Sequence, residues 1–261
     1  MNFDEILATV DGQGNGMMPE GWGQGRALFG GLVGAVLFDH LEKTVAGSRT
    51  LRSFSLSFVA PMAPGPISLH SQVFREGKSV MQAMVSARQE GEVVAAMLVS
   101  LGTARESGVI VPPAAAPAMP PPERCIELPF MPGLTPDFLQ HFQMRYADGM
   151  PPFSGSAVPD FSGYMGFRTP PQAMSTAALI ALVDTWPPSV LPMLKKPAPA
   201  SSLTWTMELL DDPGSRPADT LWQYRVKTDQ SSDGYGQSQA TIWDGEGKAV
   251  ALSRQTFTVF A

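Results

Sequence analysis

Cysteine and histidine are scarce in this chain of 261 residues, and their scarcity excludes several kinds of chemistry. The single cysteine, Cys125, rules out a disulfide within the chain, and no histidine lies near it in sequence to activate a thiol nucleophile. The three histidines, His40, His70 and His141, are far apart, and no cluster of His, Cys and acidic residues has metal-ligand spacing. A Walker A loop and a dinucleotide fingerprint are also missing. We therefore expect neither a metal nor a bound cofactor.

Positive charge and long apolar runs are lacking as well. The chain has 18 Lys and Arg against 24 Asp and Glu, a formal net charge of −6 that argues against a nucleic-acid surface. No stretch reaches the roughly 18 apolar residues of a membrane span, and the acidic N-terminus, MNFDEILATV, does not resemble a secretion signal. We expect a cytoplasmic protein whose partners include neither nucleic acid nor a membrane.

What the chain does contain is an apolar composition and an uneven distribution of proline. Hydrophobic residues make up 44% and charged residues 16%, which is typical of a globular protein with a sizeable core. Residues 109–136 hold nine of the 25 prolines, and such a composition is typical of an extended linker. This linker predicts two halves, residues 1–108 and residues 137–261.

The two halves share a pattern of strands. Residues 53–65 (SFSLSFVAPMAPG) align without a gap on residues 202–214 (SLTWTMELLDDPG). In both segments small polar residues alternate with large apolar ones and a Pro-Gly turn follows, which predicts a half-buried strand. A hairpin comes later in each half, with glycine in its connection. The predicted hairpin strands are 79–88 with 93–102, and 237–243 with 249–260.

Each half also opens with one predicted helix, residues 30–43 in the first and residues 175–185 in the second, where Ser175 or Thr176 is available as the N-cap. Both helices are apolar almost all round, as expected of a helix buried against the concave face of a sheet. The expected fold is α+β: two fused half-domains, each with a central helix wrapped by a curved antiparallel sheet, which is the double hot-dog arrangement. An unrelated α+β fold with coincidental alternation is the alternative.

Five segments give the chain a resemblance to a known family. They are Arg26–Gly31 (RALFGG), residues 53–65, Arg75–Ser79 (REGKS), Ala181–Pro188 (ALVDTWPP) and residues 249–260. In this order and spacing they resemble the acyl-CoA thioesterase II family and its double hot-dog thioesterase-like relatives, over nearly the whole chain from about Trp22. The resemblance implies hydrolysis of an acyl-CoA substrate in lipid metabolism, at a single site.

The same resemblance implies which residues form that site. The family uses an Asp, a Ser or Thr, and a Gln from the second half, which correspond here to Asp184, Ser202 and Gln255. The sequence departs from the family pattern around Ser202, where Ser201 and Thr204 are competing hydroxyls, and the linker and the region 150–171 match only loosely.

Asp184 has the sequence surroundings of a general base. It follows the apolar run 177–183, where an ionised carboxylate is costly to bury, and it lies toward the helix C-terminus, where the dipole disfavours negative charge. Both effects should raise its pKa. Ser202 and Gln255 can then orient a water between the carboxylate and a thioester carbonyl. The alternatives are that Asp184 caps a turn before Pro187 and that the two polar residues are solvated strand positions.

Two further pairs of residues complete the predicted site. Gly30 and Gly31, at the start of the first helix, are candidate backbone donors for the oxyanion, or else they only permit tight helix packing. Arg75 and Lys78 are candidate contacts for the anionic nucleotide part of CoA, or else they belong to an ordinary charged turn.

Aligning the two halves predicts that only the second is active. The aligned pairs are Asp39 with Asp184, Ser53 with Ser202, and Val99 with Gln255. The first half therefore keeps the Asp and the Ser but lacks the Gln, so we expect it to supply only its helix start to the other half's site. Asp39 and His40 are expected to form a solvated helix end rather than a second acid/base pair.

Three functions compete on this fold. The first is thioester hydrolysis by direct water attack, or through a covalent acyl-aspartate. The second is a non-catalytic module that binds acyl-CoA or an acyl carrier, since a fold does not establish activity. A hot-dog hydratase, the third, needs a His paired with an acidic residue, and the predicted second-half core has none. A fused pair can stand alone, or its sheet faces can drive a homodimer or a higher oligomer.

Overall fold

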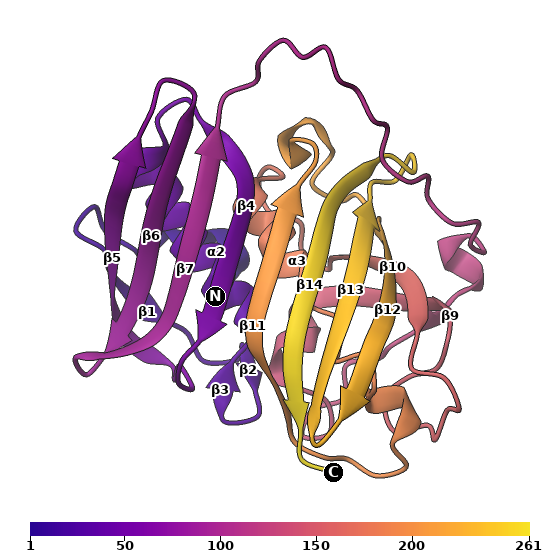
Figure 1. Cartoon of the computed structure of the whole chain (residues 1–261). Helices are drawn as coiled ribbons and strands as arrows, with labels where there is room; N and C mark the ends of the chain where they lie inside the picture. The colour runs from indigo at the N-terminus through magenta and orange to yellow at the C-terminus, as the bar shows by residue number, and fades with distance from the viewer.

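The computed structural model describes all residues 1–261 and shows two similar halves side by side (Figure 1). The first half contains α1 (Phe3–Ala8), β1 (Asn15–Met18), β2 (Gly23–Gln24), β3 (Ala27–Leu28), α2 (Gly30–Leu41), a π turn (Glu42–Ala46), β4 (Thr50–Phe58), β5 (Gly65–Glu76), β6 (Val80–Gln89) and β7 (Glu92–Gly102). The second half contains β8 (Ile126–Glu127), β9 (Phe142–Asp148), β10 (Phe161–Phe167), α3 (Thr176–Val183), β11 (Ala200–Leu209), β12 (Trp222–Ser232), β13 (Tyr235–Trp243) and β14 (Ala249–Val259). No helix in either half has the length and apolar character that crossing a membrane requires.

Twelve strands form one continuous antiparallel sheet in the order β1-β5-β6-β7-β4-β11-β14-β13-β12-β10-β9-β8. The halves meet where β4 pairs with β11, with Leu56 opposite Trp205, and Figure 1 shows these strands side by side at the centre. They are the two strands of the predicted repeat, which therefore lie at equivalent places in the two halves. Both predicted hairpins are confirmed as β6–β7 and β13–β14, with Gly91 and Gly247 in their turns at φ of 87° and 83°.

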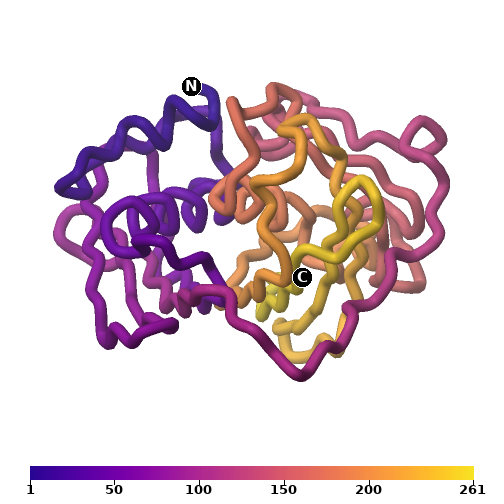
Figure 2. The backbone as a smooth tube through the Cα atoms, turned by 90° about the horizontal axis from the view of Figure 1, so that it is seen from above, coloured from indigo at the N-terminus to yellow at the C-terminus, as the bar shows by residue number.

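The two central helices pack against each other on the inner side of the sheet (Figure 2). Nearly every residue of α2 and α3 is buried, as their apolar sequences predict. The helices approach closely because α2 has a glycine at the crossing: a Cβ at Gly34 would lie 3.1 Å from Ile180 and 3.2 Å from Trp205. Ser175 accepts a hydrogen bond from the Ala178 N–H and is the N-cap of α3, as predicted.

The proline-rich segment runs along the outer side of the sheet (Figure 2). No helix or strand occurs between β7 and Pro122, yet hydrogen bonds hold the segment in place. Trp243 Nε1 donates to the Ala114 carbonyl at 2.9 Å, and Tyr164 Oη donates to the Pro120 carbonyl at 3.0 Å. Further along, the stretch 109–136 also contributes β8, which pairs with β9 near the edge of the sheet.

The C-terminal end of α2 is buried rather than exposed to solvent. The sequence predicts a solvated helix end at Asp39 and His40, and this prediction is wrong, since the two residues are only 8% and 6% exposed. Lys43, in the π turn, binds Asp39 Oδ2 at 2.7 Å. The His40 ring is covered by the loop before β1, where a Cβ at Gly14 would lie 3.2 Å from its Cε1. Burial lowers the pKa of His40, although Asp39 opposes that shift.

Candidate active site

Asp184 lies at the junction of the two central helices. It is the C-cap residue of α3, and the first turn of α2, from the other half, passes directly beside it. A Cβ at Gly30 would lie 2.7 Å from Asp184 Oδ2, and a Cβ at Gly31 would lie 2.7 Å from the Ala181 carbonyl oxygen. Glycine at these two positions lets the start of α2 approach both the carboxylate and α3. The two halves therefore build this junction together.

A chain of hydrogen bonds joins Asp184 to the two polar residues inferred from the sequence. Gln255 Nε2 donates to Asp184 Oδ1 at 2.6 Å, and Ser202 Oγ donates to Gln255 Oε1 at 3.4 Å. The last two residues come from the paired strands β14 and β11. Because the serine occupies the amide oxygen, the amide nitrogen is held toward the carboxylate. The structure thus brings Asp184, Ser202 and Gln255 into one cluster.

The backbone of β11 separates Ser202 from the two competing hydroxyls. A β-bulge between Ser202 and Thr204 shifts the register with β14. Ser201 is exposed and its Oγ donates to the Ser202 carbonyl at 3.3 Å, whereas Thr204 is exposed on the strand. Of the three hydroxyls, Ser202 is therefore the one that contacts Gln255.

Burial raises the pKa of the Asp184 carboxyl to about 7, because surroundings poor in water disfavour its charged form. Hydrogen bonds from the Gln255 amide and from the backbone N–H of Gly31 oppose this rise. The direction of the shift is the one that the sequence predicts. The two helix dipoles have opposite effects on this pKa. The negative end of α3 raises it, whereas the positive start of α2, which the carboxylate also faces, lowers it. Near neutral pH both protonation states of Asp184 are populated, as a general base requires.

The start of α2 is open toward this site. Phe29, the N-cap residue, makes no side-chain hydrogen bond, so the first N–H groups of the helix depend on partners outside it. The two glycines predicted as oxyanion donors have different surroundings. The Gly31 N–H lies close enough to the Asp184 carboxylate to lower its pKa, whereas Gly30 lines a cavity beside it and remains a candidate donor.

A cavity of about 320 Å³ opens beside Asp184. Its walls are mainly apolar and come from both halves, and they include Val33, Phe58, Met62, Val94, Leu203 and Phe260. Gly30, Asp184 and Ser202 line the same cavity. An apolar space with a few converging polar groups is the usual form of a small-molecule site. A larger cavity of about 610 Å³ lies on the outer face of the sheet and contains none of these residues, so we place the candidate active site in the smaller one.

Arg75 and Lys78 do not lie at this site. β5 begins at Gly65, three residues after Met62 of the cavity wall, and then carries the chain away from the cavity. The ten residues from Gly65 to Arg75 span about 33 Å at about 3.3 Å per residue. Arg75 and Lys78 are therefore exposed at the opposite end of the sheet. The Arg75–Ser79 motif itself does not indicate whether the strand before it, β5, leads toward the cavity or away from it.

An arginine nearer to the cavity was not among the predicted site residues. Arg26 stands in the β2–β3 turn between Gln24 and Ala27, both of which line the cavity. Its side chain is exposed and forms no ion pair. The sequence shows Arg26 only as the first residue of the RALFGG segment, and its place beside the cavity follows from the fold of the β2–β3 hairpin.

Two family models match the chain. The one described as the acyl-CoA thioesterase C-terminal domain matches residues 122–259, and the one described as the acyl-CoA thioesterase N-terminal domain matches residues 18–102. The first match alone covers more than half of the chain, and the two together include both halves of the fold. No curated protein sequence matches the chain.

Solved structures share the fold over nearly the whole chain. A conserved protein of unknown function with a hot dog fold from Alicyclobacillus acidocaldarius has a TM-score of 0.88 at 24% identity, with 99% of this chain and 98% of that one covered. A proposed thioesterase II from Thermobifida fusca has a TM-score of 0.84 at 23% identity, with coverage of 99% and 97%. Acyl-CoA thioesterase II TesB2 from Mycobacterium marinum has a TM-score of 0.75 at 21% identity, with coverage of 94% and 91%. The predicted double hot-dog fold is confirmed.

Proposed function

The chain belongs to the acyl-CoA thioesterase family, and from this membership we propose that it hydrolyses an acyl-CoA thioester with a water activated by Asp184. One observation supports this reaction more than any other. The carboxylate of Asp184 is held on one oxygen by Gln255 at 2.6 Å and lines an apolar cavity beside an open helix start. A base, a space for an acyl group and a donor for an oxyanion therefore lie together.

Asp184 acts as the general base. Gln255 occupies Oδ1, which leaves Oδ2, on the side of Gly30, to accept a proton from a water in the cavity. With a pKa of about 7, the carboxylate is available at neutral pH, and its protonated form is acidic enough to return the proton. Ser202 positions the Gln255 amide by donating to Oε1.

The water oxygen attacks the thioester carbonyl carbon while its proton passes to Asp184 Oδ2. The carbonyl oxygen becomes an oxyanion, which the N–H of Gly30 and the positive end of α2 stabilise. Collapse of the tetrahedral intermediate breaks the C–S bond, and the proton on Asp184 moves to the departing thiolate. The products are a carboxylic acid and free CoA, and the enzyme is returned unchanged.

The two ends of the substrate meet different surfaces. The acyl group lies against the apolar walls of the cavity, which both halves supply. Arg26, exposed in the hairpin that lines the cavity, is placed to contact a phosphate of CoA. In this proposal Arg26 takes the role that the sequence suggested for Arg75 and Lys78.

Release of free CoA from acyl-CoAs of graded chain length tests the proposal, with a thiol reagent as the readout. We expect wild-type protein to release CoA, and Asp184→Asn to bind the same acyl-CoA without turnover. Binding without release by the wild type would instead identify a non-catalytic acyl-CoA-binding module. Unchanged turnover by Asp184→Asn would remove this residue from the mechanism.

A further inference from the structure

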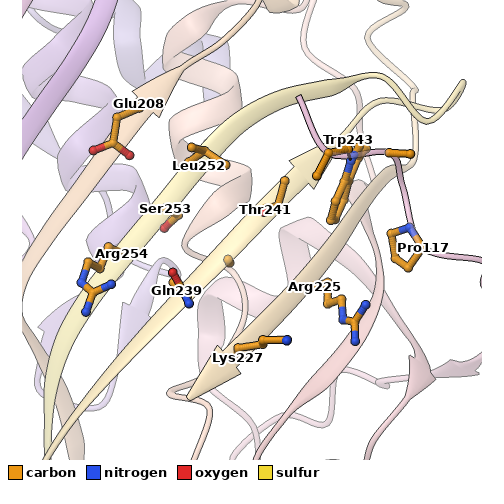
Figure 3. A pocket seen from close by; sticks show the side chains of 13 residues that line it. Pro117, Glu208, Arg225, Lys227, Gln239, Thr241, Trp243, Leu252, Ser253 and Arg254 are labelled. Atoms are coloured by element: carbon orange, nitrogen blue, oxygen red, sulfur yellow. Dashed lines mark hydrogen bonds between the residues drawn. The ribbon is translucent and has the colours of Figure 1, made fainter. Parts of the chain in front are cut away.

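The larger cavity lies on the outer face of the second half. It has a volume of about 610 Å³ and opens between the proline-rich segment, at Ala114, Ala115 and Pro117, and the strands β11 to β14 (Figure 3). This volume falls within the range of small-molecule sites, roughly 300–1,000 Å³. The proposed hydrolysis makes no use of this cavity, because Asp184, Ser202 and Gly30 line the other one.

Two neighbouring rows of side chains, all polar or basic except Leu252, cross this face. In the first row, Lys227 stands opposite Gln239, which stands opposite Arg254. In the second row, Arg225 stands opposite Thr241, which stands opposite Leu252. Residues opposite each other on adjacent strands have Cβ atoms about 5 Å apart, so each row can contact one ligand. Figure 3 shows the Arg225 and Lys227 side chains close together on the same strand.

Two of these three cations have no acidic partner. Arg254 forms an ion pair with Asp229 at 2.7 Å, whereas Arg225 and Lys227 form none. Glu208 is the one acidic residue among those that line the cavity, and it stands on β11, three strands away from β12. The net charge of the whole chain is −6, so the clustering of unpaired cations here is a local feature. Their mutual repulsion is unfavourable, and a bound anion would relieve it.

The rest of the lining offers apolar and hydrogen-bonding surface. Trp243 borders the cavity and is held under the proline-rich segment by its bond to the Ala114 carbonyl, with Pro117 nearby (Figure 3). Gln239 and Thr241 on β13 add polar groups between the neighbouring strands β12 and β14. We propose that this cavity binds a phosphate-bearing small molecule with an aromatic or apolar part. Arg225 and Lys227 contact its phosphates, and the wall of Trp243 and Pro117 contacts its apolar part.

Calorimetric titration of the whole protein with ADP tests this site, because ADP carries two phosphates and an aromatic base. We expect ADP to bind, and Arg225→Gln combined with Lys227→Gln to raise its Kd at least about tenfold, since two charge-assisted contacts are lost. The matched control is Arg75→Gln combined with Lys78→Gln, which removes the same charge from the exposed end of β5 and the turn after it and should leave the Kd unchanged. Adenosine, which lacks phosphates, should bind far more weakly than ADP.

Three results would each overturn the proposal: no binding of ADP, equal weakening in both double variants, or adenosine binding as tightly as ADP. Free CoA carries the same diphosphate, so titrating both double variants with CoA separates the two sources. If the Kd values of the two double variants differ for ADP but not for CoA, the ligand of this cavity is a nucleotide. If they differ for CoA as well, the ligand is CoA, the product of the proposed reaction. Asp184→Asn should keep its ADP binding, so the outcome does not depend on whether the proposed hydrolysis is correct.

Discussion

The central helix of each half has an aspartate near its C-terminal end, but the two aspartates have different partners. At the end of α2, Asp39 Oδ2 pairs with Lys43 Nζ at 2.7 Å, whereas at the end of α3 Asp184 Oδ1 accepts a hydrogen bond from the neutral Gln255 at 2.6 Å. Burial raises the pKa of both carboxyls, and Lys43 opposes the rise at Asp39. One aspartate is therefore neutralised by a cation, while the other remains ionisable beside a cavity.

The N-terminal starts of α2 and α3 also differ, because only α3 has a side-chain cap. Ser175 caps α3 by accepting a hydrogen bond from the Ala178 N–H. Phe29, at the start of α2, provides no such cap, and the first turn of that helix faces Asp184. A helix start without a side-chain cap and a carboxylate without a cationic partner thus lie together where α2 passes the end of α3. In the proposed reaction, the comparison therefore assigns the helix start to one half and the base to the other.

Replacing each aspartate by asparagine tests this difference most directly. We expect Asp184→Asn to lower kcat by about 10²–10⁴-fold, the usual contribution of a general base. Asp39→Asn should leave kcat close to the wild-type value, because Asp39 is bound to Lys43 and lines no part of the cavity. CoA release measures both, with circular dichroism to verify folding. Equal losses of kcat in the two variants would mean that pairing with Gln255 rather than with Lys43 does not determine which aspartate is catalytic.

Local sequence patterns could predict much of this molecule, because periodicity and turn residues act within a few positions of the chain. They predict the two apolar helices, the hairpins and the repeated strands. They cannot predict that the start of α2 passes beside Asp184, since that contact depends on how two distant helices pack. The resemblance points to Ser202 but leaves Ser201 and Thr204 as competitors, and only the bulge in β11 and the bond to Gln255 distinguish the three hydroxyls. Arg75 and Lys78 were candidates on motif alone, and the length of β5 places them far from the cavity.

Gln255→Leu removes a second difference between the halves. Gln255 pairs with Trp205 of β11, and the residue that pairs with the equivalent Leu56 of β4 is the apolar Met97, not Val99 as the sequence alignment predicts. Loss of the amide removes a hydrogen bond that lowers the pKa of Asp184, so this pKa should rise above about 7. Turnover at pH 7 should fall about 10–100-fold, since a hydrogen bond to a charged group contributes about 1.5–3 kcal/mol. Raising the pH should restore part of the loss. A profile of kcat/KM against pH that kept its wild-type midpoint would contradict this role.

Gly30 and Gly34 both face the other half from α2, but only Gly30 lines the cavity. A Cβ at Gly30 would lie 2.7 Å from Asp184 Oδ2, whereas the nearest atom to a Cβ at Gly34 belongs to Ile180, at 3.1 Å. Gly30→Ala should therefore lower turnover about tenfold, equivalent to about 1.4 kcal/mol in the barrier. Gly34→Ala should mainly destabilise the fold, by about 1–3 kcal/mol, through overpacking. CoA release and thermal unfolding separate the two effects, and a purely structural role for Gly30 would show as lost stability with unchanged kcat.

The raised pKa of Asp184 predicts how activity and stability depend on pH. Below about pH 7, kcat/KM should fall about tenfold per pH unit as the base becomes protonated. The folded-state pKa lies above the unfolded value of 3.8, so the folded protein holds an extra proton between these pH values. Stability from this group is therefore full below about pH 4 and is lost as the pH rises to about 7.

Urea unfolding of wild type and Asp184→Asn checks this linkage. The variant should be more stable than wild type at pH 8 by about 2 kcal/mol, half of the full linkage value, because the carboxylate keeps some contact with solvent through the cavity. Near pH 4 the two proteins should be about equally stable. A difference in unfolding free energy that stayed constant between these pH values would show that Asp184 titrates normally in the folded state.

The smallest expected effect separates Ser202 from its neighbour Ser201 and from Ser53, the aligned serine of the first half. Ser202→Ala should lower kcat about 3–10-fold, since a hydrogen bond between neutral groups contributes about 0.5–1.5 kcal/mol and here positions the Gln255 amide. Ser201→Ala should have no effect, because its Oγ donates only to the Ser202 carbonyl. Ser53→Ala, at the aligned position of the first half, should also be silent, because no glutamine stands there to be positioned. CoA release under saturating substrate measures all three. A loss confined to Ser201→Ala would show that the bulge in β11 does not determine which hydroxyl serves the site, and that the two strands differ only in sequence.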